Sequence, residues 1–586
     1  MRRALPWIGI AALLALGLAG LHALQVEDIL APNAACRGCS VLSTFAHDAW
    51  LLALQFVLLA LAASVSPRGL RVVFGTLAAA LLLACALDQL SLRLFTQRLY
   101  VDDVLRFASQ TSSDWSVLRT LLVSGNGVFY TAFALLIAAT ALGLILAAQR
   151  APRLARVLLA GAALWLLAAV LARTPAQAVR NQLAWNLIEA NLPQGSTRAY
   201  SQGFIDSELQ TSRRVPQTCE GRAPGLHPNV VIVITESLSA YQSALLGGPL
   251  DWLPRLDALA RANHYFTHFY ANGFNTIGGE VALLTGRPPL PQVGSPRHEL
   301  AAFGADENTL PAIVHRAGYT THYFTASDLD YEQSGTWLRA LGFDSVEGSE
   351  NPYYAGMPRG EFNAAEDAAL FSRFEQWLDQ RQDTRPFLAV LLTVSSHPPF
   401  AHPRTGELDA QKTFGYIDEQ LVEFHAQLGR RGFLDDGVLL ITGDHRSMTP
   451  LLPEESRDFG SRAFARIPLL VAGAVDMPRV VDAAFSQSDV PASLAHFLGV
   501  DHCRAPFNGY FLSQQPTPPQ FIVHARGDER DRVSVYAGAA SADYLEDGDA
   551  SRWLDGGLPQ ADLIAGWLVA QRVRNAPVVP ARTQAP

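Results

Sequence analysis

The sequence predicts a bundle of five membrane-spanning helices at the amino terminus, followed by an α/β domain with a mainly parallel sheet. Composition is the first observation behind this prediction. The 586-residue chain is 49% hydrophobic and only 17% charged, which is too apolar for a wholly soluble protein. The long uncharged runs all lie in the first 173 residues. From about Pro228 onward, short apolar runs alternate with amphipathic stretches, a pattern typical of α/β domains.

Five uncharged runs are candidates for membrane helices, since about 20 residues cross the hydrocarbon core of a bilayer. They are residues 5–24, 49–65, 72–87, 121–148 and 157–172. Arg2 and Arg3 precede the first run, as in a signal peptide. We interpret this run as a retained helix, because no clear cleavage site follows it and four more runs come after.

Arginine placement predicts the orientation of these helices, because short cytoplasmic loops collect positive charge. The amino terminus, the second connection and the fourth connection contain arginine but no acidic residue. The arginines are Arg2, Arg3, Arg68, Arg71, Arg150, Arg153 and Arg156. We therefore expect a cytoplasmic amino terminus, and an odd number of spans places everything after Arg173 outside the cytoplasm.

The connecting segments have their own expected structures. Residues 92–115 mix apolar and charged side chains, which is typical of a helix lying on the outer membrane surface. Residues 174–227 form an extracytoplasmic linker, either interfacial or an inert spacer. The α/β domain covers 228–515. The extension at 516–586 contains a candidate strand pair, 521–524 with 532–536, and we expect its last twenty residues to be disordered.

The charge balance excludes one class of function, and the cysteines limit another. A net charge of −9, with Lys412 as the single lysine, argues against nucleic-acid binding. Five cysteines are too few for a disulfide scaffold or a cysteine-rich zinc module. Outside the cytoplasm, disulfides are permitted. The candidate pairs are Cys36 with Cys39 and Cys219 with Cys503.

Polar residues follow three of the predicted strands. The strand at 229–235 is followed by Glu236, the strand at 387–394 leads to His397, and the strand at 437–442 leads to Asp444 and His445. Ligands gather at the carboxyl ends of the strands in such sheets. Each residue alone could be an ordinary cap or loop residue, but their coincidence at one edge predicts a site for a divalent cation.

Thr276 is the candidate nucleophile. It lies in a glycine-rich turn, 272–280, that leads into a predicted helix, and a helix amino terminus stabilises a nearby phosphate oxyanion. Contact with a cation activates a hydroxyl oxygen as a nucleophile. The alternative is that Thr276 only caps the helix.

Four ordered stretches resemble a known family. They are Asn229–Ser239, Asn275-Thr276, Thr393–Phe400 and Thr442–His445. These stretches are similar to those of the lipoteichoic acid synthases and phosphoglycerol transferases, which are related to lipid A phosphoethanolamine transferases within the sulfatase and alkaline phosphatase superfamily. Family members carry five membrane helices before an extracytoplasmic sulfatase-like catalytic domain, so the resemblance covers almost the whole chain.

The resemblance implies roles for individual residues. The cation ligands would be Glu236, Thr276, Asp444 and His445, with Thr276 also the nucleophile. The cofactor would be one divalent cation, Mn²⁺ or Zn²⁺, with Mg²⁺ as a third candidate. The substrate contacts would be His397, Trp337 and Arg339. The last two matches are loose because the local spacing departs from the family pattern, and Trp337 is as readily interpreted as a core residue.

The resemblance also implies a reaction and a location. The enzyme would move a phospholipid head group, foremost phosphoglycerol from phosphatidylglycerol, through a phosphothreonine intermediate to a glycan or glycolipid acceptor. It would be a multi-pass protein of the bacterial cytoplasmic (inner) membrane. Its amino terminus would be cytoplasmic and its catalytic domain periplasmic or extracellular.

Several alternatives stay open at this point. A phosphoethanolamine transferase shares the same site. A sulfatase of the main type needs Cys or Ser in a Cys/Ser-x-Pro-x-Arg sequence, which residues 276–280 lack, and a two-metal phosphatase needs further histidines, which are absent from 446–473. An inactive, lipid-binding regulatory protein is disfavoured because all four proposed ligands are retained.

Overall fold

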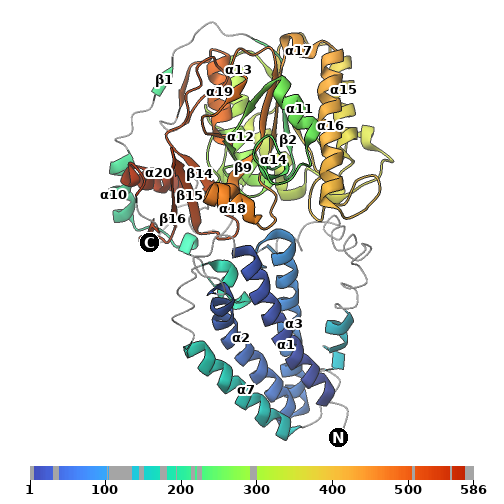
Figure 1. The fold of residues 1–586 in the computed structure, drawn as a ribbon, viewed down its shortest axis with the longest axis vertical. Helices are drawn as coiled ribbons and strands as arrows, with labels where there is room; N and C mark the ends of the chain where they lie inside the picture. The colour runs from blue at the N-terminus through green and yellow to red at the C-terminus, as the bar shows by residue number, and fades with distance from the viewer. Residues whose placement is uncertain are drawn as a thin grey trace, which may run out of the picture. The chain divides into compact units, whose positions relative to one another are not determined.

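The structure is a computed structural model, and it divides the chain into two units that are treated separately. It describes residues 5–30, 39–101, 103–104, 135–140, 142–143, 151–171, 181–192, 195–212, 218–220, 227–290, 300–504, 508–554 and 557–574. The helical unit contains most residues up to Leu192, and the α/β unit contains most residues from Pro193 onward. Figure 1 shows both.

Four helices among the described residues are long and apolar enough to cross a membrane. They are α1 (Leu5–Leu30), α2 (Cys39–Ser64), α3 (Arg68–Phe95) and α7 (Pro152–Leu171). α1 and α3 contain the runs predicted at 5–24 and 72–87, and α2 and α7 contain all but the last residue of the runs predicted at 49–65 and 157–172. The remaining predicted run, 121–148, lies outside the described residues except for short helical pieces at 135–140 and 142–143. The count of five spans is therefore not confirmed.

The helices continue through charged residues at which the sequence predicted loops. α1 runs through Glu27 and Asp28, and α3 runs through Asp88 to Phe95. The predicted surface helix at 92–115 is therefore wrong at its start, because 92–95 belong to α3, which ends at the left-handed Thr96. Residues 105–115 lie outside the described residues. Helical hydrogen bonds do not depend on the polarity of the side chain, and Asp88 is paired with Arg98.

Part of the predicted linker packs on the helical unit. Residues 181–192 contain η2 (Gln182–Ala184) and α9 (Leu187–Ala190). Asn186 and Glu189 form a capping box that starts α9. The Glu189 carboxylate is 2.8 Å from His47 Nδ1 and accepts a hydrogen bond of 2.7 Å from Trp50 Nε1. Both partners belong to α2, so this segment is fixed to that helix.

The α/β unit is built on an eight-stranded, mostly parallel sheet. The strand order is β11 (Val480–Val481), β3 (His264–Phe266), β10 (Leu469–Gly473), β8 (Val438–Gly443), β2 (Val230–Thr235), β7 (Phe387–Leu392), β5 (Thr320–Thr325) and β6 (Ser345–Glu347). The five strands from β8 to β6 are parallel, whereas β10 runs antiparallel to β8. The central strands are buried throughout, which explains their continuous apolar sequences.

Helices cover both faces of this sheet (Figure 1). One core contains side chains from α12 (Thr276–Thr285), α13 (Leu310–Arg316), α14 (Ser334–Leu341) and α19 (Val490–Phe497). The other contains side chains from α11 (Pro254–Ala262), α15 (Asp367–Gln380), α16 (Ala410–Arg430) and α17 (Phe433–Asp436). Successive residues of β2 alternate between the two, as Val230 and Val231 do. The sheet is therefore the middle layer of three.

Smaller elements complete the chain. A three-stranded sheet joins β12 (Phe485–Ser486), β4 (Phe269–Tyr270) and β9 (Arg466–Ile467), and α18 spans Pro453–Phe459. β1 (Thr218–Glu220) pairs antiparallel with β13 (His502–Arg504), and the backbone register sets Cys219 opposite Cys503. A disulfide between them stays a prediction. The predicted Cys36–Cys39 pair is untested, since Cys36 lies outside the described residues.

The carboxy-terminal extension folds as a second sheet with a helix. Its strands are β14 (Ile522–Ala525), β15 (Arg532–Ala537), β16 (Ala540–Leu545) and β17 (Arg552–Trp553), all antiparallel, and its helix is α20 (Ala561–Arg574). The predicted disorder of the last twenty residues is wrong for 567–574, which end α20. Trp567 and Leu568 are buried in a core shared with this sheet, so tertiary packing supports the helix.

A buried ion pair connects α20 to the rest of the α/β unit. Arg572 Nε lies 3.2 Å from Glu546 Oε2, and both side chains are fully buried. Arg572 also donates to the Tyr200 hydroxyl at 2.5 Å and to the Ser196 carbonyl at 2.6 Å. Burial raises the pKa of Glu546 to about 7, although Arg572 opposes the shift. The guanidinium therefore joins three chain segments, one of which leads into α10 (Gln202–Ser212).

Replacing Arg572 is expected to destabilise the part of the α/β unit in which α20 packs on the carboxy-terminal sheet. Arg572→Met leaves a buried carboxyl group without its counter-charge, at a cost of about 3–5 kcal/mol in unfolding free energy. Arg574→Met is the matched control on the same helix, because the Arg574–Asp306 pair is partly exposed and is worth less than about 1 kcal/mol. Hydrogen exchange of the β16 amides measures both. Equal effects would contradict the role given to Arg572.

Candidate metal and nucleophile site

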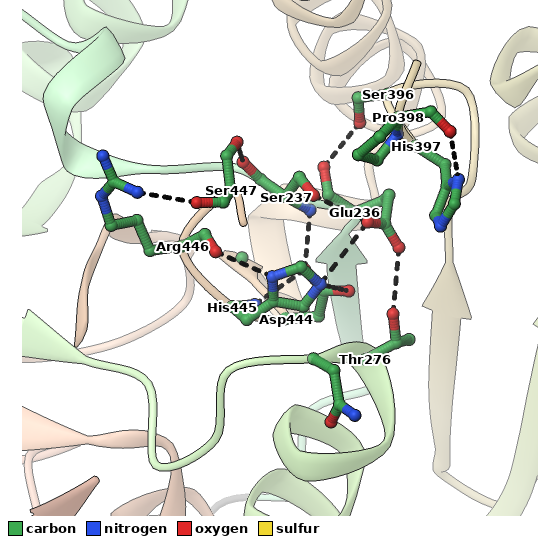
Figure 2. Close-up of polar contacts among 12 residues, drawn as sticks. Glu236, Ser237, Thr276, Ser396, His397, Pro398, Asp444, His445, Arg446 and Ser447 are labelled. Atoms are coloured by element: carbon green, nitrogen blue, oxygen red, sulfur yellow. Dashed lines mark hydrogen bonds and ion pairs between the residues drawn. The ribbon is translucent and has the colours of Figure 1, made fainter. Parts of the chain in front are cut away.

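The candidate site lies where three parallel strands end side by side. In the register of the sheet, Thr235 of β2 is opposite Gly443 of β8, and Ile234 is opposite Leu392 of β7. The residues that follow these strand ends therefore meet at one edge. Figure 2 shows the side chains after β2 and β8 converging there.

Glu236, Asp444 and His445 form a compact cluster. One potential ligand atom from each lies within 4.8 Å of the others. His445 Nε2 is 3.5 Å from Glu236 Oε1 and 3.3 Å from Asp444 Oδ2. The Thr276 hydroxyl donates a hydrogen bond of 3.1 Å to Glu236 Oε2. The structure thus brings together all four residues proposed as cation ligands.

Hydrogen bonds to the backbone occupy one atom of Asp444 and one of His445, and they leave the other atom of each side chain available to bind a cation. Asp444 Oδ1 accepts from the backbone N–H groups of Ser237 and His445, each at 2.7 Å. His445 Nδ1 donates to the Arg446 carbonyl at 2.9 Å, since a carbonyl can only accept, and this leaves a lone pair on Nε2. Asp444 Oδ2 and His445 Nε2 are buried with no hydrogen-bond partner. Two orphaned ligand atoms beside the Glu236 carboxylate fit a divalent cation.

The pKa values of the three side chains also indicate a cluster that would favour a bound cation. Burial and the adjacent Glu236 raise the pKa of Asp444 well above its usual range. Burial would raise the pKa of Glu236 too, but the adjacent His445 holds it at about 2. Although burial disfavours the imidazolium, Asp444 and Glu236 raise the pKa of His445 to about 9. Protons therefore balance the buried carboxylates, and a cation would replace them.

The local geometry of α12 places the Thr276 hydroxyl next to Glu236. Asn275 caps the helix, with Oδ1 accepting from the Gly278 N–H at 2.9 Å. Thr276 is the first helical residue and is not the cap, so its hydroxyl is free to bond Glu236. A Cβ atom on Gly279 would lie 2.1 Å from the Asp444 carbonyl oxygen. Only glycine permits the helix to approach the metal-binding loop this closely.

Several supporting residues carried no signal in the sequence. Gln487 donates from Nε2 to the Gly443 and Asp444 carbonyls, at 3.0 and 2.6 Å. The Ser396 hydroxyl donates to the Glu236 carbonyl at 2.5 Å. Asp367 accepts 3.0 Å bonds from the backbone N–H groups of Val394 and Ser395. These contacts fix the loops after β7 and β8 from distant parts of the chain.

His397 lies beside the cluster, at the end of the β7 loop. Its Nδ1 donates to the Pro398 carbonyl at 2.7 Å, which leaves Nε2 as an acceptor. Burial lowers the pKa of His397, while the charge of Glu236 opposes that shift. Its ring packs edge-on against Phe362 at 4.6 Å, and Phe362 packs against Tyr331 at 4.7 Å. The two aromatic rings were not predicted.

The structure does not bring Trp337 and Arg339 to the cluster. Trp337 is 5% exposed within the sheet core, and its Nε1 donates to the Phe303 carbonyl at 3.0 Å. These contacts agree with the core interpretation of Trp337, and a substrate contact by this residue stays a prediction. Arg339 is exposed in the last turn of α14. The apolar face of α14, with Trp337 in it, packs on the sheet.

The carboxy-terminal sheet supports the turn before Thr276. Asn272 accepts a backbone bond of 2.8 Å from Ala525, and its side chain donates to the Val523 carbonyl at 2.8 Å. A Cβ atom on Gly527 would meet the Phe274 ring at 2.1 Å. The extension thus forms part of the support for the candidate nucleophile.

Comparisons with known proteins identify the domain that carries this site. The family model described as Sulfatase matches residues 228–500. This match covers a little under half of the chain, and it shows that the α/β domain is sulfatase-like. Members of this superfamily bind a divalent metal, in accord with the cluster at Glu236, Asp444 and His445.

Curated relatives extend the likeness. Lipoteichoic acid synthase 2 of Bacillus subtilis (strain 168) is 25% identical over 346 residues, which cover 53% of this chain and 51% of the relative. Phosphoglycerol transferase I of Xanthomonas campestris pv. campestris (strain B100) is 23% identical over 331 residues, covering 53% and 46%. The chain spans about half the length of these relatives. With the four apolar helices, the likeness indicates a bacterial membrane protein.

A solved structure is similar to part of the chain. It is a protein of the alkaline phosphatase superfamily from Vibrio parahaemolyticus, which is 21% identical with a TM-score of 0.49. The alignment covers 64% of this chain and 94% of that structure.

The close approach of α12 to Asp444 gives a test of the site's geometry. Gly279→Ala is expected to move α12 or the Asp444 loop and to lower divalent-cation content at least about tenfold, because ligand sites tolerate displacements of only about 0.5 Å. Gly415→Ala is the control, since a Cβ there meets nothing within 4 Å. Metal analysis of the purified proteins measures both. Full cation content in Gly279→Ala would contradict the proposed ligand geometry.

Cation binding is expected to weaken as the pH falls. The raised pKa values of Asp444 and His445 mean that the empty cluster holds protons at neutral pH, and the cation must displace them. Each displaced proton lowers the affinity about tenfold per pH unit on the acid side. Calorimetric titration with Mn²⁺ in two buffers of different ionisation enthalpy measures the proton release. A pH-independent affinity without proton release would contradict this account.

Proposed function

We propose that the protein transfers the phosphate-bearing head group of a membrane phospholipid to an extracytoplasmic hydroxyl acceptor through Thr276. The observation that carries the proposal is the Thr276 hydroxyl, held 3.1 Å from Glu236 at the start of α12, beside two buried ligand atoms without partners. Four apolar helices on the same chain give a reason for a lipid substrate. The activities named for the two relatives, lipoteichoic acid synthase and phosphoglycerol transferase, agree with a head-group transfer.

Glu236, Asp444, His445 and Thr276 would hold one divalent cation, Mn²⁺ or Zn²⁺, with Mg²⁺ as a third candidate. A cation held there supplies positive charge that stabilises the phosphate oxygens as the reaction proceeds. Thr276 is at the amino terminus of α12, and a helix amino terminus favours a bound anion. Glu236 orients the Thr276 hydroxyl through its hydrogen bond.

The reaction has two displacement steps at phosphorus. In the first, the Thr276 hydroxyl gives up its proton to Glu236 and its oxygen forms a bond to phosphorus. The bond from phosphorus to the glycerol oxygen of diacylglycerol breaks, and that oxygen takes up the proton that Glu236 received. In the second step, an acceptor hydroxyl attacks phosphothreonine and the bond from phosphorus to the Thr276 oxygen breaks. The proton of the acceptor passes to His397 Nε2 and from there to the released Thr276 oxygen. His397 suits this role because Nδ1 is occupied by the Pro398 carbonyl.

Phosphoglycerol from phosphatidylglycerol is the proposed donor group, and a glycan or glycolipid is the proposed acceptor. Support comes from the names of the relatives, a phosphoglycerol transferase and a lipoteichoic acid synthase. The proposed location is the bacterial cytoplasmic membrane, with the amino terminus inside and the α/β unit outside. That orientation rests on the arginines of the connections and on a fifth span within 121–148.

A covalent intermediate on Thr276 provides the central test. Thr276→Ala in the full-length protein is expected to lower head-group transfer by at least about 10³-fold, as removal of a nucleophile does. Thr276→Ser retains a hydroxyl and should keep measurable transfer. The assay uses vesicles with head-group-labelled phosphatidylglycerol, Mn²⁺ and a glycolipid acceptor, followed by mass spectrometry of the Thr276 peptide. Undiminished transfer by Thr276→Ala would remove this residue from the mechanism.

The same assay separates the alternative functions. Labelled phosphatidylethanolamine as the preferred donor would indicate a phosphoethanolamine transferase. Release of the label to water without an acceptor product would indicate an ester hydrolase. No turnover with either lipid, despite full cation content, would indicate a regulatory lipid-binding protein.

A further inference from the structure

The helical unit contains a buried cluster of charged side chains. His22 Nδ1 of α1 lies 2.8 Å from Asp48 Oδ2 of α2, and Arg98 Nε donates to Asp88 Oδ1 of α3 at 3.1 Å. His22 and Arg98 also bond the Leu183 carbonyl, at 2.9 and 2.8 Å. The four side chains are at most 6% exposed. Ionisable groups inside a membrane bundle are expensive to bury and commonly mark functional sites.

The cluster lies at a defined level along the helices. His22 is eight residues before the end of α1, Asp48 is nine residues after the start of α2, and Asp88 is seven residues before the end of α3. At 1.5 Å per residue, all three are about 10–14 Å from the same end of the bundle. Helices of this length exceed the hydrocarbon core of about 30 Å. The cluster therefore lies just below the level of the lipid head groups.

A cavity of about 40 Å³ adjoins the cluster. By volume it admits roughly three water-sized groups. Its polar lining includes Gln55 and Gln89 beside Asp48 and Asp88. The apolar lining consists of Ala15, Leu18, Ala19, Leu51, Leu52, Leu81, Leu82, Cys85 and Leu187. The lining of the cavity thus combines polar and apolar side chains.

Two acceptor atoms at this cavity are unused. Gln55 Oε1 and Gln89 Oε1 are buried without a hydrogen-bond partner in the described residues, and the two side chains are 3% and 6% exposed. The Gln55 amide N–H group already donates to the Ala78 carbonyl at 3.1 Å. Burying an unpaired acceptor is unfavourable. A ligand in this cavity would gain most by donating hydrogen bonds.

We propose that this cavity binds the free hydroxyl of a neutral glycerolipid, with diacylglycerol as its ligand. The vacant acceptors require a donor, and the apolar part of the lining suits the carbon atoms next to a lipid hydroxyl. Arg98 is paired with Asp88, and His22 bonds Asp48, so the cavity offers no free positive charge to a phosphate. The level of the cavity matches the glycerol unit of a lipid. The choice of diacylglycerol as the ligand rests on the proposed function, because diacylglycerol is the alcohol released in the first step of that reaction.

The test measures lipid binding in a protein that cannot turn over. Full-length Thr276→Ala in phosphatidylcholine nanodiscs is exposed to a diacylglycerol with a photoactivatable group in one acyl chain. Peptide mapping should find the label on the parts of α1, α2 and α3 that line the cavity. The methyl ether of the same lipid, which lacks the donor proton, should label these peptides about three- to tenfold less, the value of one or two hydrogen bonds.

Matched substitutions complete the test. Gln55→Leu and Gln89→Leu, each in the Thr276→Ala protein, remove an acceptor but keep the side-chain volume. Each should lower labelling about three- to tenfold with only a small change in thermal stability. Removal of the unpaired acceptor offsets the loss of the Nε2 hydrogen bond to the Ala78 carbonyl or to Asp88. Gln25→Leu is the control, since Gln25 Oε1 is also buried and unpaired but does not line the cavity. It should leave labelling unchanged.

Three results would overturn the proposal. They are equal labelling by the methyl ether, unchanged labelling in both glutamine variants, and stronger labelling of these peptides by a phosphatidylglycerol probe. The head-group transfer assay on the protein with Thr276 intact is read separately. If that assay fails while hydroxyl-dependent labelling persists, the proposed function is wrong and the lipid site stands. If transfer occurs without such labelling, the lipid site is wrong.

Discussion

The contact between Gly279 and the Asp444 carbonyl is the constraint on which the candidate active site depends. It sets α12 against the loop after β8, and it thereby places the Thr276 hydroxyl within hydrogen-bonding distance of Glu236. Gln487 holds the opposite side of the same loop through the Gly443 and Asp444 carbonyls. A nucleophile on a helix and ligands on a sheet edge are thus brought to one position by backbone packing.

The remaining architecture keeps that contact in place. The central strands supply a rigid edge because they are buried on both faces. The carboxy-terminal sheet supports the turn before Thr276 through Asn272 and Phe274, and Arg572 ties that sheet to α20 and to the segment at Ser196. The extension, which looks dispensable in a sequence, therefore supports the candidate site.

The sequence predicted the features that depend on local order. Glu236, Asp444 and His445 follow strands directly, so the parallel-sheet rule was enough to bring them to one edge. Gln487, Asp367 and the contact of β14 with Asn272 depend on packing between distant segments, which one sequence does not display. Trp337 was left with two interpretations because a buried aromatic on an amphipathic helix and a substrate contact look alike in one dimension. Charged residues near the ends of α1 and α3 were mistaken for loops, because uncharged length is an incomplete guide to a helix whose charges are paired.

The depth of the cation ligands has a consequence for how the metal is acquired. Glu236 is 3% exposed, and Asp444 and His445 are fully buried. An ion held by such ligands exchanges slowly with solvent, because the surrounding loops must open before the ligands can be rehydrated. Occupancy would then reflect the ions present where the domain folds more than the later balance of affinities among competing metals. For a domain that folds after export, the available ions would be those outside the cytoplasm.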